Sequence, residues 1–501
     1  MADRLINVEF QSGRSFQQQI REKLVDLIQQ DYFGISPLPS SRKMAQSLGV
    51  SRNTIMQVYE SLVDEDFLVS RERSGYFVNP NLDIHINKFD VSETTQSINK
   101  THSDKLKWND RLKNKPSSFS AVKKDKNWVT YSYPFIYGQI EHTHFPLYQW
   151  RECTRIAQNK NSIHEWIEDY IDADSKELIS QIRHNILPKR GIVASPEQIL
   201  ITLGTQNSLY LLASLLTNEE TVVGLEDPGY VDQRHIFSSA RSQLAFLEID
   251  HNGVVLGKQL EPCDYVCITP SHQYPTTVTM PIERRVALLE QAMSDDFIII
   301  EDDYESEINF HERPLPALKS MDKDGRVIYT GSLSKSLSPG LRIGYLVADE
   351  ELITELRSLR RLQYRHPPVN NQSTTALFIG QGYYDSHLRR MRALYEAKWT
   401  LMSQGIKKHF KNCEVHETRG SFCFWIGLPN ALKSTDLVTH AVSFSILVES
   451  GDSLFAKTSA PKNFIRLGFS AIPENKIEEG LEKLGNLIHQ LTTSSTQLKT
   501  I

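Results

Sequence analysis

The sequence predicts two folded parts of different class, a small module of three helices with a β-hairpin and a large α/β domain. Three observations support this division. Apolar residues recur every three or four positions through residues 15–67, residues 80–127 lose that periodicity, and short apolar runs alternate with helical stretches after Trp128. At 501 residues the chain is also long enough for more than one domain.

Composition indicates a water-soluble protein of a reducing compartment. No apolar stretch is long enough to span a bilayer, and no charged-then-apolar signal begins the chain. The five cysteines are scattered and lack the paired spacing of a zinc site. We therefore expect a cytoplasmic protein without a metal site. Since the net charge is -5, any contact with nucleic acid must come from a local patch.

The first module, over residues 10–80, has the element order of a winged helix-turn-helix. The segment Leu-Pro-Ser-Ser at 38–41 supplies a helix N-cap, and Gly49 stops the short helix that follows. The apolar spacing predicts helices over 15–30, 42–48 and 51–67 and a small hairpin over 68–78.

Small polar residues and arginines gather on the elements that would face DNA. In a helix-turn-helix the second helix enters the major groove by its N-terminal end, and a preceding helix N-terminus suits a phosphate. The candidate DNA-binding residues are Ser40, Ser41, Arg42, Ser51, Arg52, Asn53, Thr54 and Gln57, with Arg71, Arg73 and Gly75 in the wing. The alternative is a three-helix module that docks onto another protein, because this geometry alone does not prove contact with DNA.

Residues 81–127 have the composition of a flexible basic linker. They are rich in Ser, Thr, Asn and Lys, and residues 90–127 contain nine Lys or Arg against five Asp or Glu. Such a segment either contacts phosphates or is a solvated tether between the two domains.

The second domain, over residues 128–495, has the strand pattern of an α/β fold. Buried parallel strands are short and nearly continuous in apolar residues, because helices cover both faces of their sheet. Runs of this kind occupy residues 199–202, 221–225, 264–269, 297–300 and 326–330.

The segment 332–345, Ser-Leu-Ser-Lys-Ser-Leu-Ser-Pro-Gly-Leu-Arg-Ile-Gly-Tyr, favours a site for pyridoxal phosphate. The amine of Lys335 can bond to an aldehyde carbon as an imine. The hydroxyl of Ser332 and the guanidinium of Arg342 can converge on one phosphate dianion. The alternative is a polar loop with an incidental lysine.

Other residues at predicted strand ends offer the remaining contacts that this cofactor needs. A carboxylate must keep the pyridine nitrogen protonated, and Glu-Asp-Asp-Tyr at 301–304 directly follows an apolar strand, although such acidic strand ends also cap helices. Gly204, Thr205 and Gln206 open a helix whose N–H groups suit a phosphate. Tyr230 follows the next strand and offers an aromatic ring.

The motifs at 38–55 and 70–78 resemble the winged helix of GntR-type bacterial regulators, and those from about 200 to 475 resemble a class I/II aminotransferase. Together they resemble the MocR (PdxR-like) subfamily, in which the second domain is a fold type I, aminotransferase-like domain that binds pyridoxal 5'-phosphate. The resemblance places Asp302 on the ring nitrogen, Tyr304 on the ring oxygen, Tyr230 against the ring and Arg466 on a ligand carboxylate. One departure is Thr277, which stands where a glycine is usual.

The function implied by this resemblance is that of a homodimeric transcriptional regulator that binds promoter DNA. An amine or amino acid effector would displace Lys335 from the cofactor, form an external aldimine and shift the population between DNA-binding arrangements. Two alternatives remain open. One is an active aminotransferase with an appended DNA-binding domain, in which Lys335 also moves the catalytic proton. The other is an architectural DNA-binding protein, which would carry no cofactor.

Overall fold

The computed structural model describes residues 6–82, 107–119, 125–160, 163–168, 172–305, 307, 315–416 and 420–498. The chain divides into two compact units, Met1–Lys113 and Asn114–Ile501. The predicted linker lies partly outside the described residues, so its flexibility stays a prediction. Among the residues that are described, no helix is both long and apolar enough to cross a membrane.

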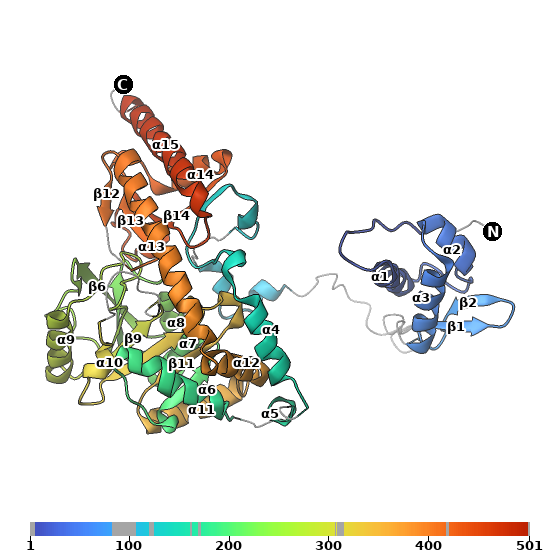
Figure 1. Cartoon of the computed structure of the whole chain (residues 1–501), viewed down its shortest axis with the longest axis horizontal. Coiled ribbons are helices and arrows are strands. Elements are labelled where there is room, and N and C mark those ends of the chain that lie inside the picture. The colour runs from blue at the N-terminus through green and yellow to red at the C-terminus, as the bar shows by residue number, and fades with distance from the viewer. Residues whose placement is uncertain are drawn as a thin grey trace, which may run out of the picture. The chain divides into compact units, whose positions relative to one another are not determined.

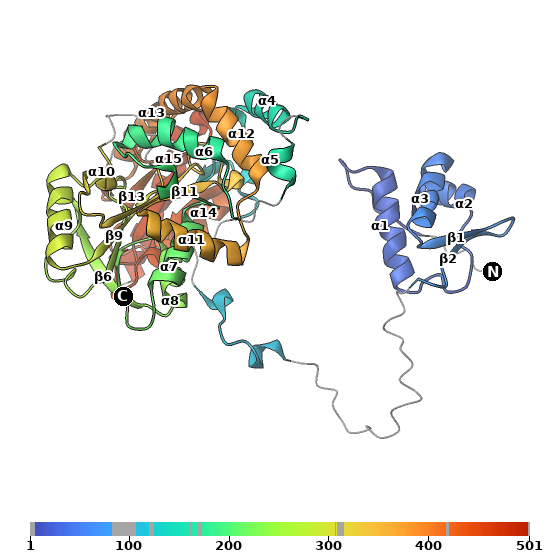
Figure 2. The ribbon, with the colours of Figure 1, turned by 90° about the horizontal axis from the view of Figure 1, so that it is seen from below.

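The first unit has the predicted order of three helices and a hairpin (Figures 1 and 2). Serine hydroxyls cap all three helices, and Gly49 ends the second in a left-handed conformation with φ 66°. The elements are α1 (Phe16–Gln29), α2 (Ser41–Leu48), α3 (Arg52–Asp64) and the antiparallel strands β1 (Leu68–Arg71) and β2 (Gly75–Val78). Their apolar faces form one core that includes Ile20, Leu24, Ile55, Leu62 and Leu68. The winged helix-turn-helix prediction is confirmed.

The second unit contains two sheets. Their strands are β3 (Tyr133–Phe135), β4 (Ile199–Thr202), β5 (Val222–Asp227), β6 (Gln243–Asp250), β7 (Gly253–Val254), β8 (Tyr265–Ile268), β9 (Ile298–Asp303), β10 (Val327–Ser332), β11 (Gly344–Val347), β12 (Glu414–His416), β13 (Cys423–Gly427), β14 (Ile446–Ser450) and β15 (Phe464–Gly468). The large sheet has the order β4-β11-β10-β9-β8-β5-β6-β7, and the smaller one β12-β13-β15-β14-β3.

Helices surround both sheets (Figure 1). They are α4 (Leu147–Ala157), α5 (His164–Ile167), α6 (Lys176–Gln181), α7 (Thr205–Leu216), α8 (Val231–Ser239), α9 (Ile282–Ser294), α10 (Leu318–Met321), α11 (Glu350–Gln363), α12 (Val369–Gly380), α13 (Tyr383–His409), α14 (Ser434–Ala441) and α15 (Ile477–Leu498). On β10, Ile328 packs with the α7 and α11 side, whereas Tyr329 packs with residues of α12 and α13. Because alternate residues are buried on opposite faces, the strand sequences are almost continuously apolar.

All five predicted apolar runs are buried strands of the large sheet, and all five run in one direction. The pairs β5–β8, β8–β9 and β9–β10 are parallel, whereas β4 pairs antiparallel with β11. Strand β11 is itself antiparallel to β10, so β4 still runs in the same direction as β10. The carboxyl ends of β4, β5, β8, β9 and β10 therefore meet at one edge of the sheet.

Candidate functional site

In the first unit, the predicted DNA-facing residues lie at helix starts and in the hairpin turn. Ser40 and Ser51 are the N-caps of α2 and α3, so their hydroxyls already accept hydrogen bonds from backbone N–H groups. Arg52, the first residue of α3, is exposed, and its Nε donates to Ser41 Oγ at 3.4 Å. Arg42, Asn53 and Gln57 are exposed as well, whereas Ser41 and Thr54 are half-buried.

The wing presents its basic residues to solvent. Arg71, Arg73 and Gly75 are all exposed, and the guanidinium of Arg71 lies 4.5 Å from the centre of the Phe77 ring. Gly75 has a φ of 103°. This left-handed backbone favours glycine and forms the tight turn of the hairpin.

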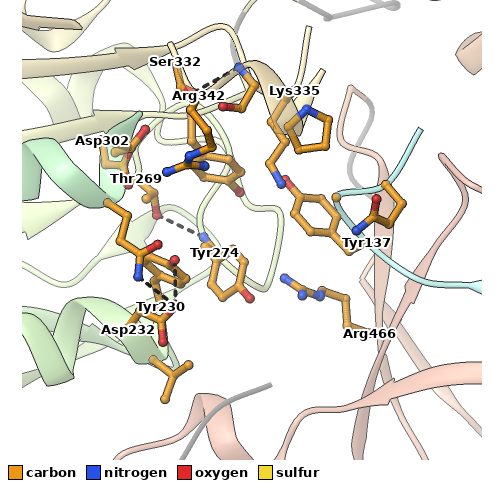
Figure 3. Close-up of a pocket in the computed structure, with 18 residues that line it drawn as sticks. Tyr137, Tyr230, Asp232, Thr269, Tyr274, Asp302, Ser332, Lys335, Arg342 and Arg466 are labelled. Carbon is orange, nitrogen blue, oxygen red and sulfur yellow. Dashed lines mark hydrogen bonds between the residues drawn. The ribbon is translucent and has the colours of Figure 1, made fainter. Parts of the chain in front are cut away.

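In the second unit, the carboxyl-terminal edge of the large sheet opens into a cavity of about 450 Å³ (Figure 3). Nine of the residues predicted from the sequence line it, from segments spread over more than 250 residues. They are Thr205, Gln206, Tyr230, Asp302, Tyr304, Ser332, Lys335, Arg342 and Arg466. The tenth, Gly204, does not line the cavity but lies close to the guanidinium of Arg342.

The strand register explains why three of these segments meet. Gly344, at the start of β11, pairs with Ser332 on one side and with Thr202 on the other. The start of β11 therefore lies between the ends of β10 and β4. A Cβ atom on Gly344 would lie 2.6 Å from the Cα of Gly204, and one on Gly204 would lie 3.1 Å from Arg342 Nη2. Glycine is thus required for this close approach, which brings Arg342 to the start of α7.

Two hydroxyl groups of residues that line the cavity are buried without a hydrogen bond. Within the described part of the chain, Thr205 Oγ1 and Ser334 Oγ have no partner. The neighbouring Ser332 Oγ accepts a hydrogen bond from the Ser334 N–H at 3.1 Å. Buried polar atoms of a folded protein are nearly always paired, so this arrangement favours an anion with several acceptor oxygens. The cationic Arg342 and the positive end of α7 favour it further.

Asp302 is the penultimate residue of strand β9, and its carboxylate is buried at the cavity wall. Its Oδ1 accepts a hydrogen bond from Thr330 Oγ1 at 3.3 Å. Burial, with smaller contributions from the neighbouring Asp303 and Glu226, raises the pKa of Asp302 to about 8. A cation placed against this carboxylate would lower the pKa of Asp302 and keep the carboxylate ionised. An ionised carboxylate in turn keeps a pyridine nitrogen protonated.

Lys335 and the aromatic residues surround the centre of the cavity. The Lys335 Nζ lies 4.3 Å from the centre of the Tyr137 ring (Figure 3). The Tyr230 hydroxyl donates to Asp232 Oδ2 at 3.0 Å, which holds that ring at the start of α8. The Tyr304 hydroxyl donates to the backbone oxygen of His272 at 2.9 Å.

Arg466 lies at the other end of the cavity, on β15. Its guanidinium is flanked by two rings, with Cζ 4.4 Å from the centre of Tyr137 and 4.6 Å from that of Tyr274. It is also paired with a buried carboxylate of β14, Glu449, which the sequence did not suggest.

Several lining residues were missed at the sequence level: Tyr137, Gly138, Gln139, Val231, Asp232, Thr269, Tyr274, Ser334 and Pro339. Thr269 and Tyr274 follow the end of β8, so the rule that sites form at strand ends could have found them. Thr269 Oγ1 donates to the buried Glu226 at 2.6 Å and accepts from the Tyr274 N–H at 3.0 Å. Tyr137 comes from the segment after β3 and carried no comparable signal.

Thr277, which stands where a glycine is usual, has the backbone conformation of a glycine. Thr277 has a φ of 67°, the left-handed conformation that a glycine adopts at little cost. The threonine hydroxyl donates to the backbone oxygen of Thr276 at 2.6 Å. The turn is therefore formed without the glycine.

Comparisons with known proteins match both units. Residues 16–78 match the bacterial regulatory proteins of the gntR family, and residues 143–484 match aminotransferase class I and II. The HTH-type transcriptional regulator TauR of Rhodobacter capsulatus is 35% identical over 453 residues, covering 90% of this chain and 92% of the relative. The probable rhizopine catabolism regulatory protein MocR of Rhizobium meliloti is 28% identical, covering 91% and 90%.

Solved aminotransferases share the fold of the second unit. LysN, an alpha-aminoadipate aminotransferase from Thermus thermophilus solved with N-(5'-phosphopyridoxyl)-L-leucine, matches with a TM-score of 0.69 and 25% identity, covering 77% of this chain and all of that one. Kynurenine aminotransferase of Pyrococcus horikoshii matches with a TM-score of 0.70 and 24% identity, covering 76% and 98%. Both matches fit a class I and II aminotransferase fold.

Proposed function

The chain belongs to the MocR-type transcriptional regulators, which join a GntR helix-turn-helix to a class I and II aminotransferase domain, and we propose that the second domain binds pyridoxal phosphate and senses an amine. The observation that carries this proposal is the cavity in which Lys335, Asp302 and Arg342 converge. The regulator would act in the cytoplasm as a homodimer on promoter DNA.

The residues of the cavity fit the cofactor. The unpaired hydroxyls of Thr205 and Ser334, with Arg342 and the start of α7, would hold the phosphate. Asp302 would hold the ring nitrogen, and Tyr230 would pack against the ring. Lys335 supplies the only primary amine among the described residues that line the cavity. When bound, pyridoxal phosphate supplies an aldehyde carbon that reacts with amines and a ring that withdraws electrons.

The remaining residues of the cavity would bind the effector. Arg466 supplies a buried hydrogen-bond donor, and the rings of Tyr137 and Tyr274 pack on its guanidinium. An amine that reaches Lys335 would therefore place its distal end near Arg466. A ligand shifts an equilibrium between two protein conformations only by the difference in its affinity for them. The effector must therefore bind one DNA-binding arrangement more tightly than the other.

The cavity also supports a second candidate, a working aminotransferase. Lys335 keeps the amine that can move a proton at a bound substrate, and Asp302 keeps the carboxylate that supports the ring. The distinction between the two functions is whether a ketoacid is released at each cycle.

The two candidates can be separated with the full-length protein loaded with pyridoxal phosphate. A panel of amines and amino acids is added, and the visible band, the affinity for the promoter and ketoacid production are measured on the same samples. A sensor shows a change in band and in promoter affinity without continued ketoacid release. Continued release with unchanged promoter affinity would favour the enzyme and contradict the sensor.

Replacing Asp302 with asparagine is expected to weaken cofactor binding by about tenfold or more, because a neutral amide does not stabilise a protonated ring nitrogen. The same change should stabilise the cofactor-free protein at high pH. The folded-state pKa of about 8 lies above the value of about 4 of an unfolded aspartate, so the wild type loses stability as the pH rises from about 4 to about 8, and the loss is complete above that pH.

Cofactor titration and urea unfolding at pH 6 and pH 9 measure these two effects. Glu226→Gln is the matched control, because Glu226 is a buried carboxyl beside Asp302 whose pKa is raised to about 7 but which does not line the cavity. Equal cofactor affinity in Asp302→Asn and wild type would contradict the proposed contact between Asp302 and the ring nitrogen.

A further inference from the structure

The segment that leads from the first unit into the second makes an aromatic contact with helix α8. Residues 107–118 are exposed, and Pro116–Ser118 forms one short helical turn that ends at Phe119. The Phe119 ring stacks on the imidazole of His235 in α8, with ring centres 4.6 Å apart and an angle of 8° between the ring planes. Only 38% of Phe119 is exposed, so most of its surface is covered. Phe119 therefore attaches the predicted linker to α8.

Helix α8 is also a wall of the cavity. Tyr230 is its N-cap and Asp232 belongs to its first turn, and both residues line the cavity (Figure 3). Val231 lines the cavity as well. His235 lies four residues after Val231, so the two side chains lie on the same face of the helix. One helical turn, roughly 5.4 Å along the axis, thus separates the Phe119 contact from the cavity wall.

The first turn of α8 is held by groups that a bound ligand would contact. Asp232 Oδ2 accepts hydrogen bonds from the Tyr230 hydroxyl at 3.0 Å and from Gln206 Nε2 at 3.4 Å. Tyr230 carries the ring that would pack against the pyridine, and Gln206 lies in the first turn of α7, beside the proposed phosphate site. A ligand that moves either side chain changes the hydrogen bonds that position α8.

Other hydrogen bonds join α8 to the segment between β14 and β15. Arg234 Nη2 donates to the backbone oxygen of Ser453. Just before the helix, the Gly229 N–H donates to the backbone oxygen of Leu454 at 2.9 Å. Because β15 carries Arg466, α8 is connected to the effector side of the cavity as well as to the cofactor side. A helix of nine residues moves as one rigid element, so a change at its first turn reaches His235.

We propose that the face of α8 around His235 is the docking surface for the linker at Phe119, and that α8 transmits occupancy of the cavity to the linker through this contact. The inference rests on the proposed function and names the residues that connect its two halves. Stacked rings attract each other only over a narrow range of offsets, so a small shift of α8 weakens or strengthens the attachment of Phe119.

Two probes change the occupancy of the cavity in the full-length protein. The first is pyridoxal phosphate, added to a cofactor-free sample. The second is aminooxyacetate, a small amine with a carboxylate that combines with the aldehyde of the cofactor, added to the cofactor-loaded protein. The dissociation constant for promoter DNA is measured in the three states, and visible spectra of the same samples monitor occupancy. The ratio of the largest to the smallest constant measures the coupling between the cavity and DNA.

Phe119→Ala is expected to reduce a wild-type ratio of about fivefold or more to about one. The affinity for pyridoxal phosphate should not change, because Phe119 does not line the cavity. Phe119→Tyr keeps the ring and should keep the ratio. Trp108→Ala is the matched control, because it removes an aromatic ring of the same segment that is 68% exposed. A wild-type ratio retained in Phe119→Ala would overturn the inference.

His235→Ala removes the other ring of the contact. It should lower the ratio as far as Phe119→Ala does, and the double variant should show no further loss, because both changes act through one contact. A ratio that His235→Ala leaves at the wild-type value would show that α8 does not act through the ring contact, and would also overturn the inference.

A fluorine label separates this inference from the proposed function. The ¹⁹F resonance of 4-fluorophenylalanine at position 119 reports the ring contact in the absence of DNA. It is expected to shift when either probe enters the wild-type cavity and to stay in place in His235→Ala. If the resonance shifts but promoter affinity responds to neither probe, transmission to the linker stands and the sensing function fails. If promoter affinity responds without a shift, the sensing function stands and the role of Phe119 fails. If neither responds, both fail.

Discussion

Replacement of Lys335 by alanine is expected to abolish the visible absorption band of the cofactor-loaded protein. Lys335 is the only lysine among the described residues that line the cavity, and a covalent bond to the aldehyde requires a primary amine. The loss should be complete, because no neighbouring side chain in the described cavity can replace the amine. Absorption spectra of wild type and variant, each loaded with excess cofactor and desalted, measure the effect.

Lys335→Arg is the control for charge. It keeps a cation where Lys335 Nζ now lies, 4.3 Å from the centre of the Tyr137 ring, but it lacks a primary amine. It should therefore lose the band as the alanine variant does while retaining more of the noncovalent cofactor affinity. Borohydride reduction of the wild type followed by peptide mapping identifies the modified residue. A label on a lysine other than Lys335 would refute the assignment.

Replacement of Arg52 by alanine is expected to weaken promoter binding and leave the cofactor spectrum unchanged. Arg52 is exposed at the first residue of α3, and its Nε contacts Ser41 at the start of α2. A lost base contact costs about 1 to 3 kcal/mol and relaxes sequence preference. A lost phosphate contact weakens all sequences alike and reduces the salt slope by about one.

Titration of the promoter and of a scrambled duplex at several salt concentrations distinguishes the two roles. Arg21→Ala is the matched control, because Arg21 is a half-buried arginine of α1 in the same unit that is paired with Glu65. The control removes the same charge from a helix that is not predicted to face DNA. If Arg52→Ala binds the promoter as tightly as wild type at every salt concentration, α3 does not read DNA as predicted.

The helix-turn-helix was predictable from the sequence because its signals are local. The spacing of Ile20, Leu24, Ile55 and Leu62 defines helix faces within a few turns, and the serine caps and Gly49 mark helix ends through neighbouring backbone groups. The conformation of residues 81–127 could not be predicted beyond their composition, since their sequence has no apolar periodicity from which helices or strands could be predicted.

Half of the residues that line the cavity were predictable for a related reason. Asp302, Ser332 and Tyr230 each lie at or just beyond the carboxyl end of a buried strand, and strands that run in one direction present these ends at one edge. Segments far apart in the chain could thus be assigned to one site from strand ends alone. The pairing of the strands was not predictable, because burial on both faces does not show which neighbour a strand has: β4 runs in the direction of β10 but pairs with the antiparallel strand β11.

The sequence by itself determined the helices and hairpin of the first unit, five strands of the large sheet, and which residues have the chemistry for a phosphate, a pyridine ring and an amine, because those signals reside in a few consecutive residues. Only the tertiary structure decided which side chains complete the cavity and what each of them faces. Tyr137 reaches the site from a segment with no motif, and Glu449 meets Arg466 solely through the register of β14 and β15. A shift of one residue in that register would turn Glu449 to the other face of the sheet, and the sequence of neither strand specifies such a pairing.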